Sequence, residues 1–194
     1  MINLPKIAIT GGIGCGKTYV CQLLESRGIR VYYCDEAAKR LIQTSEMLQC
    51  KLQKLVGQEV YVNKVLQKSV LAKFLLASEQ NKHAVNAIVH PVVAGDFEAS
   101  GCYWLESAIL FESGFYKRIH FDLTICVTAP LEVRITRVMA RDDITRAQAL
   151  AWINNQMTQE EILRRSDFEI VNDGACDVNI QINDILEQLK HTNY

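Results

Sequence analysis

The chain has 194 residues, of which 49% are hydrophobic and 22% charged, a composition that excludes disordered and collagen-like classes and indicates a folded globular protein. Its formal net charge of −1 gives no overall attraction for nucleic acid, so any affinity for anions has to come from local clusters. No apolar stretch approaches the roughly 20 residues that span a bilayer, and residues 1–5 lack the features of a signal peptide, so we expect a cytoplasmic protein.

The chain opens with a strand, a glycine loop and a helix. Residues 6–10 are apolar and β-branched, residues 11–16 are rich in glycine, and apolar residues after Lys17 recur at helical spacing. The spacing Gly11-x4-Gly16-Lys17-Thr18 is that of a P-loop, whose N–H groups and following helix bind phosphates. It predicts that Lys17 contacts the β- and γ-phosphates and that Thr18 ligates Mg²⁺. A dinucleotide-binding loop is the alternative, but that loop requires Gly or Ala at position 17.

A second strand is predicted over residues 29–33, and a helix over residues 36–42. Asp35 lies between them, at the carboxyl end of a strand, which is the edge where open α/β sheets bind ligands. Asp is also a favoured N-cap residue. Asp35 therefore either has a role in the ligand site or caps the helix that follows.

Residues 45–100 contain little glycine, and their apolar residues recur at helical spacing, which predicts an all-helical insertion. Pro91 is expected to end or bend one of these helices. His90 next to it is either structural or in contact with a ligand.

Two short apolar runs, residues 102–105 and 123–127, fit buried parallel strands. Glu106 and Glu112 lie between them, near a strand end. Either carboxylate could help to hold Mg²⁺ through water, as the acidic residue of a second P-loop strand does, or be a solvated surface charge.

A helix is predicted over residues 132–141, with Arg134, Arg137 and Arg141 on one face. Their partner is either a polyphosphate, which suits the planar donor fork of arginine, or nearby acidic residues on a solvated face. Capping-box patterns begin at Thr145 and Thr158, so two short helices follow, and the whole segment suggests a lid. Residues 168–171 are the last predicted strand and 178–191 a closing helix.

The joint pattern of these residues resembles that of dephospho-CoA kinases. Its parts, in the order and spacing of that family, are Gly11 to Thr18, Asp35 after a strand, His90-Pro91, Ile109-Leu-Phe-Glu112, Arg137-x3-Arg141-Asp, Gln156 and Asp167 to Asn172-x-Gly174. The resemblance implies ATP-dependent phosphorylation of the ribose 3′-hydroxyl of dephospho-CoA, the last step of coenzyme A synthesis.

The fold that the resemblance implies is α/β, a three-layer P-loop NTPase core with a parallel five-stranded sheet, plus a helical insertion and a helical lid. Residues 1–44, 101–131 and 167–194 would form the core, 45–100 the CoA-binding insertion and 132–166 the lid. The implied partner is the small molecule dephospho-CoA, with ATP as co-substrate and Mg²⁺ as cofactor. No nucleic acid, membrane or protein partner is implied.

The resemblance also implies roles for individual residues. The catalytic residues would be Lys17, Asp35, Arg137 and Arg141, with Asp35 orienting or deprotonating the acceptor hydroxyl. The substrate would contact Asp35, His90, Pro91 and Glu112. ATP would be bound by Gly12, Ile13, Gly14, Cys15, Gly16, Lys17, Thr18, Tyr19 and Asn172, and the metal by Thr18.

The chain departs from the family pattern at several positions. Tyr33 replaces the first residue of the usual Asp-x-Asp, Ala108 replaces Pro, and Gln67-Lys68 replaces an Asp/Asn-Arg pair. Cys15 replaces the loop serine, either as a spacer or as a thiol activated beside Lys17.

Two other functions remain: a P-loop kinase of another small acceptor, such as a nucleoside or nucleotide, and a GTPase-like switch. The absence of an Asn-Lys-x-Asp guanine-reading segment counts against the switch.

Overall fold

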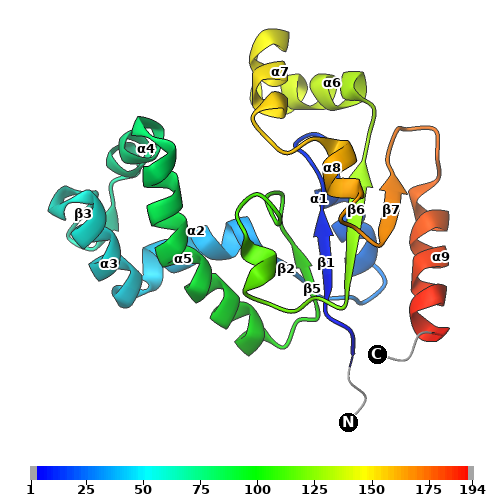
Figure 1. Ribbon diagram of the computed structural model, residues 1–194, viewed down its shortest axis with the longest axis horizontal. Helices are drawn as coiled ribbons and strands as arrows, with labels where there is room; N and C mark the ends of the chain where they lie inside the picture. The colour runs from blue at the N-terminus through cyan, green and yellow to red at the C-terminus, as the bar shows by residue number, and fades with distance from the viewer. Residues whose placement is uncertain (1–3, 192–194) are drawn as a thin grey trace. The chain divides into compact units, whose positions relative to one another are not determined.

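The computed structural model describes residues 4–191, and the chain forms two compact units (Figure 1). The first unit is made of the two segments up to Tyr32 and from Cys102 onwards, and the second is the segment Tyr33–Gly101. We describe each unit by itself.

A five-stranded sheet in the order β2-β5-β1-β6-β7 is the framework of the first unit. Its strands are β1 (Ile7–Thr10), β2 (Val31–Tyr33), β5 (Trp104–Glu106), β6 (Leu123–Thr128) and β7 (Phe168–Val171). β1 pairs in parallel with β5 and β6, so that Ile7 lies opposite both Trp104 and Leu123, and β6 pairs in parallel with β7. Every residue of β1 is buried, which explains why the first three residues of this central strand, Ile7 to Ile9, are all apolar.

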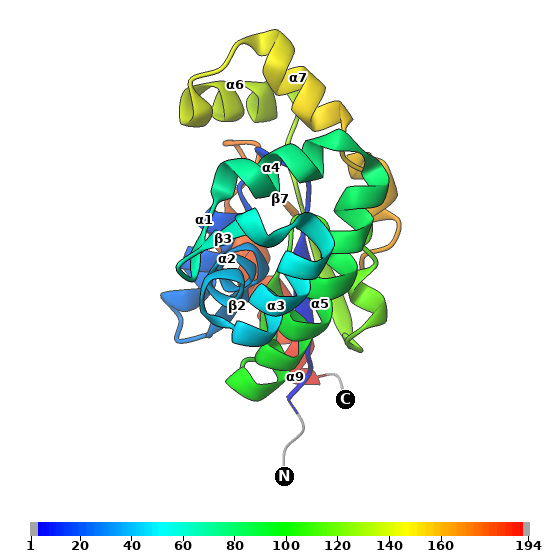
Figure 2. The same ribbon diagram turned by 90° about the vertical axis from the view of Figure 1, so that its left-hand side faces the viewer.

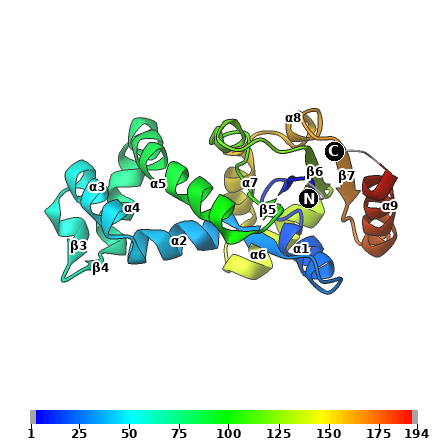
Figure 3. The same cartoon turned by 90° about the horizontal axis from the view of Figure 1, so that it is seen from below.

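Helices cover both faces of this sheet. They are α1 (Lys17–Glu25), α6 (Leu131–Asp142), α7 (Arg146–Asn154), α8 (Gln159–Leu163) and α9 (Val178–His191), with a short 3₁₀ helix η2 (Phe115–Lys117). Leu24 of α1 and Ile182 of α9 line one small apolar space with Ile170 of β7, so α1 and α9 pack on the same face. Figure 3 shows α8 on the opposite side of the sheet. The predicted three-layer α/β fold with a five-stranded parallel sheet is confirmed.

Helices α6 and α7 have a small core of their own. Ile135 and Val138 of α6 pack with Ala149 and Ile153 of α7, and the side chain of Ile13 from the glycine loop packs against this cluster. The two helices therefore pack against each other and against the glycine loop through apolar contacts.

The second unit is mostly helical. Its helices are α2 (Cys34–Thr44), α3 (Glu46–Val56), α4 (Lys68–Ala77) and α5 (Glu79–Ser100), with a 3₁₀ helix η1 (Gln58–Val60). Buried side chains at helical spacing, among them Leu48 and Leu52 of α3 and Val85 and Val89 of α5, form its core. Figure 2 shows α3, α4 and α5 gathered around it. Within the described residues, none of the helices of either unit has the length and apolar character needed to cross a lipid bilayer.

The second unit differs from the sequence prediction in two details. The all-helical prediction was wrong for Tyr61–Val62 (β3) and Val65–Leu66 (β4), which form an antiparallel hairpin. Its turn has positive φ at Asn63 and Lys64. Strands of two residues are too short to show the alternation of apolar and polar residues by which a strand is predicted. Pro91 lies inside α5, so of the two predicted effects the ending of a helix was wrong, and the bending of one stays a prediction.

Candidate active site

The glycine loop, residues 11–16 between β1 and α1, is wedged against α6 and the end of β7. Gly14 has a φ of +81° and Gly16 a φ of +90°, values that other residues rarely adopt. A Cβ atom on Gly14 would lie 2.7 Å from the carbonyl oxygen of Arg134, and one on Gly16 would collide with the side-chain amide of Asn172. Both the positive φ and the lack of room for a Cβ atom therefore require glycine at positions 14 and 16.

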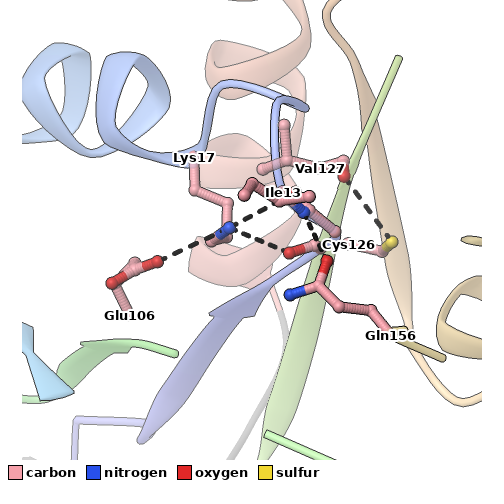
Figure 4. Close-up of polar contacts among 8 residues, drawn as sticks. Ile13, Lys17, Glu106, Cys126, Val127 and Gln156 are labelled. Atoms are coloured by element: carbon pink, nitrogen blue, oxygen red, sulfur yellow. Dashed lines mark hydrogen bonds and ion pairs between the residues drawn. The ribbon is translucent and has the colours of Figure 1, made fainter. Parts of the chain in front are cut away.

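The side chain of Lys17 folds back over the loop (Figure 4). Its Nζ donates to the carbonyl oxygen of Gly11 at 2.9 Å and to that of Gly12 at 3.4 Å, and lies 3.9 Å from Oε1 of Glu106. The side chains of Lys17 and Glu106 are each only 10% exposed, so water screens their attraction weakly. Of the two carboxylates that the sequence singled out, Glu106 is therefore the one beside the loop.

Glu112 contacts a different part of the first unit. Its Oε1 accepts a hydrogen bond from the backbone N–H of Met157 at 3.1 Å, in the turn between α7 and α8. Its Oε2 is buried and has no hydrogen-bond partner among the described residues. One acceptor of Glu112 is thus structural, and the other is available to a donor.

Gln156, the residue before Met157, binds the glycine loop itself. Its Oε1 accepts from the N–H of Ile13 at 2.7 Å, while Nε of Arg134 donates to the carbonyl oxygen of Ile13 at 2.9 Å (Figure 4 shows the first contact). The sequence prediction did not include Gln156 among the site residues. A glutamine in a turn carries no local signal of a partner 143 positions away.

The three arginines of α6 have different environments. Arg134 is buried against Gly12, and burial lowers the pKa of its guanidinium. Nη1 of Arg137 donates to the carbonyl oxygens of Asn172 at 3.0 Å, Cys15 at 3.3 Å and Gly14 at 3.4 Å. Arg141 faces solvent and pairs with Asp142 at 2.7 Å. Arg134 and Arg137 therefore meet loop carbonyls, and only Arg141 fits the solvated-face alternative.

Asn172, which follows β7 directly, closes the loop from its other side. Its Nδ2 donates to the carbonyl oxygen of Cys15 at 3.0 Å, and its Oδ1 accepts from Nη2 of Arg137 at 3.4 Å. The side chain is buried. Asn172 thus supports the loop backbone.

The thiol of Cys15 is buried within this arrangement. It is fully shielded from solvent, as are those of Cys21 and Cys126, with which it interacts electrostatically. Burial raises the pKa of Cys126 to about 12 and also raises the pKa of Cys21, where the Glu106 carboxylate adds to the effect. A thiol that is shielded from solvent is a poor target for reagents, which favours the spacer interpretation of Cys15 over the activated thiol.

Two side chains in the first turn of α1 face solvent. Thr18 and Tyr19 are both exposed there. No group of three or more His, Cys, Asp or Glu residues suited to a metal ion occurs within residues 4–191. Mg²⁺ typically takes only one or two protein ligands beside water and phosphate, so the Thr18 hydroxyl and a nearby carboxylate match its donor chemistry.

Asp35, His90 and Pro91 belong to the second unit. Asp35 is exposed and is the second residue of α2, whose N-cap is Tyr33. The prediction that Asp35 caps the helix was therefore wrong: its carboxylate lies in the first turn, where it interacts favourably with the helix dipole. His90 is half-buried and Pro91 exposed, one after the other on α5.

Comparison with known proteins places this geometry in a family. Residues 6–177 match the family model described as dephospho-CoA kinase. The chain is 40% identical to the dephospho-CoA kinase of Bacteroides fragilis strain YCH46, over 93% of this chain and 91% of that protein. It is 38% identical to the dephospho-CoA kinase of Salinibacter ruber, over 89% of this chain and 90% of that protein.

Solved structures share the fold. A crystal structure of a Thermus thermophilus protein that is 33% identical superposes with a TM-score of 0.79, covering 94% of this chain and 96% of that one. A shikimate kinase from Acinetobacter baumannii, 16% identical, superposes with a TM-score of 0.56, covering 98% of this chain and 95% of that one, and shows the fold alone.

Proposed function

Because the chain belongs to the dephospho-CoA kinase family, we propose that it transfers the γ-phosphoryl group of ATP to the 3′-hydroxyl of dephospho-CoA, giving coenzyme A and ADP. It is a kinase, a phosphotransferase with an alcohol group as acceptor. One observation carries the proposal: the family match spans residues 6–177, and so includes the helical second unit and helices α6 to α8 as well as the loop that many ATPases share.

In the proposed reaction the glycine loop and Lys17 hold the β- and γ-phosphates of ATP. The Nζ of Lys17 already lies at the loop, where it donates to two carbonyl oxygens and lies near Glu106. Phosphate oxygens are negatively charged and are stronger acceptors than carbonyl oxygens, so the ammonium group, already held at the loop, binds the phosphates when ATP enters. Phosphoryl transfer needs little covalent chemistry from the protein, so positioning and charge stabilisation account for most of the rate.

Arg137 and Arg141 stabilise the charge that develops on the migrating phosphoryl group. Arg137 supports this role by its place against the loop carbonyls of Gly14 and Cys15, from which the guanidinium has only a short way to move. Arg141 lies one turn further along α6 and is exposed, so it reaches the phosphates only if α6 and α7 close as a lid. Closure also excludes water, which limits wasteful hydrolysis of ATP.

The acceptor hydroxyl is oriented or deprotonated by Asp35. This carboxylate follows β2, and in parallel α/β sheets ligands bind at the carboxyl ends of the strands. The unpaired Oε2 of Glu112 supports a contact with a donor group of the substrate. His90 and Pro91 on α5 complete the proposed substrate-binding set, with the second unit as the part that binds CoA.

Mg²⁺ would be held by the Thr18 hydroxyl, with Glu106, whose Oε1 lies 3.9 Å from Nζ of Lys17, as the carboxylate beside the loop. When bound, the ion neutralises charge on the β- and γ-phosphates. ATP would also contact Gly12 to Gly16, Tyr19 and Asn172. We keep a cytoplasmic location and the division into core, insertion and lid as parts of this proposal.

An acceptor screen tests the proposed function. The protein is incubated with ATP and Mg²⁺ and offered dephospho-CoA, nucleosides or nucleoside monophosphates in separate reactions, and ADP release is measured. We expect ADP release with dephospho-CoA far above the other acceptors. Preferential turnover of a nucleoside or nucleotide would support the kinase of another small acceptor, and tight GTP binding with slow turnover would support the nucleotide switch.

A further inference from the structure

The Gly12–Ile13 peptide of the glycine loop is bound on both of its polar sides. Its N–H donates to Oε1 of Gln156 at 2.7 Å. Its carbonyl oxygen, that of Gly12, accepts from Nζ of Lys17 at 3.4 Å and from the N–H of Cys15 at 3.3 Å. Figure 4 shows Gln156 and Lys17 approaching this part of the loop together.

The rigidity of the peptide bond couples these contacts. The peptide is trans and planar, so its N–H and its C=O point in opposite directions. Whatever holds the N–H of Ile13 toward Gln156 therefore also holds the carbonyl group of Gly12 toward Lys17. Glycine at position 12 leaves this peptide free to rotate, because its backbone is the least restricted of all residues.

Gln156 is itself well anchored. It lies in the turn between α7 and α8, where the N–H of the next residue, Met157, is bound by Glu112 at 3.1 Å. The side chain of Gln159, the first residue of α8, accepts from the N–H of Ala129 at 3.0 Å, at the end of β6. The contact of Met157 with Glu112 thus fixes the turn directly beside Gln156 and gives the carboxamide of Gln156 a stable base, whereas the contact of Gln159 holds the start of α8 to a segment outside the glycine loop.

We propose that Gln156 is a positioning residue for the phosphotransfer: by holding the N–H of Ile13 it orients the Gly12 carbonyl group, which holds the ammonium group of Lys17 at the loop before ATP binds. The inference rests on the proposed function, in which Lys17 binds the β- and γ-phosphates. Preorganisation of this kind lowers the cost of binding ATP and leaves the chemical step largely unchanged.

The test replaces Gln156 by methionine, which is similar in length but has no acceptor, and by glutamate, which keeps one. Gln159→Met is the matched control, because it removes the same kind of acceptor from the same turn but frees a backbone N–H outside the loop. In Gln156→Met we expect faster hydrogen exchange at the Ile13 amide of the ligand-free protein. We also expect the KM for ATP to rise about fivefold, the effect of one neutral hydrogen bond, with kcat changed less than about twofold.

Gln156→Glu should keep the slow exchange at Ile13, and Gln159→Met should keep both the exchange rate and the KM for ATP of the parent protein. Parent-like exchange and KM in Gln156→Met would overturn the proposal, and so would equal effects in Gln159→Met. If Gln156→Met does not fold, the parent protein decides: a through-bond NMR coupling between the Ile13 nitrogen and the Gln156 carbonyl carbon supports the proposal, and its absence contradicts it. Exchange at Ile13 is measured without substrates, so it is independent of whether dephospho-CoA is the acceptor.

Discussion

Replacing Arg137 by lysine tests whether α6 is tied to the glycine loop as the structure shows. The guanidinium makes one contact of 3.0 Å and two longer ones to backbone carbonyl oxygens, and Nη2 reaches Oδ1 of Asn172 at 3.4 Å. An ammonium group keeps the charge but has no fork, so we expect it to retain only one of these four contacts. Because three of the four contacts are 3.3 Å or longer, we take the loss of three as equivalent to about one charge-assisted hydrogen bond, on the order of 2 kcal/mol.

For a chain of this size, about 2 kcal/mol corresponds to a Tm lowered by roughly 4–8 °C. This change in Tm is measured by thermal melting of the protein without added ligand, with Arg146→Lys as the matched control. Arg146 lies on α7 and pairs with Glu132 on the surface at 2.7 Å, and such exposed pairs contribute little to stability. A Tm of Arg137→Lys equal to that of the parent protein would refute the reasoning, because it would mean that the guanidinium does not hold the loop in solution.

Three further predictions concern single residues of the proposed site. Arg141→Lys should lower kcat, because an ammonium group lacks the bidentate fork, and full activity would leave Arg141 as a surface charge paired with Asp142. A thiol reagent should modify the exposed Cys50 rapidly and leave Cys15 unmodified until the protein unfolds, whereas fast modification of Cys15 that Mg·ATP prevents would revive the activated-thiol interpretation. Asp35→Asn should lower turnover of dephospho-CoA by roughly 10²–10⁴-fold with a near-parent Tm, and an active variant would require another base.

The parts of the fold that the sequence predicted correctly are those where the local backbone dictates the residue types. The run from Ile7 to Ile9 is apolar because the strand is covered on both faces of the sheet. Glycine stands at positions 14 and 16 because φ is positive there and neighbouring atoms leave no room for a side chain. The family resemblance, drawn from such local patterns in their order along the chain, is confirmed.

What the sequence did not predict depends on contacts between distant residues. The cap of α2 falls on Tyr33 because the strand runs directly into the helix, which places Asp35 two residues past the cap position that its residue type suggested. The hairpin of β3 and β4 is too short to show alternation. The helical spacing of the arginines placed Arg134 and Arg137 on one face, but only the packed structure shows that loop carbonyls lie opposite.

The most direct test of the central claim is transfer of label from γ-labelled ATP to dephospho-CoA by the parent protein and by Lys17→Ala. The account predicts coenzyme A labelled at its 3′-phosphate, formed with ADP in equal amounts, by the parent protein. A folded Lys17→Ala variant should be slower by several orders of magnitude, because the charge of Lys17 acts mainly in the transition state. ADP release without labelled coenzyme A, or near-parent transfer by Lys17→Ala, would contradict the account.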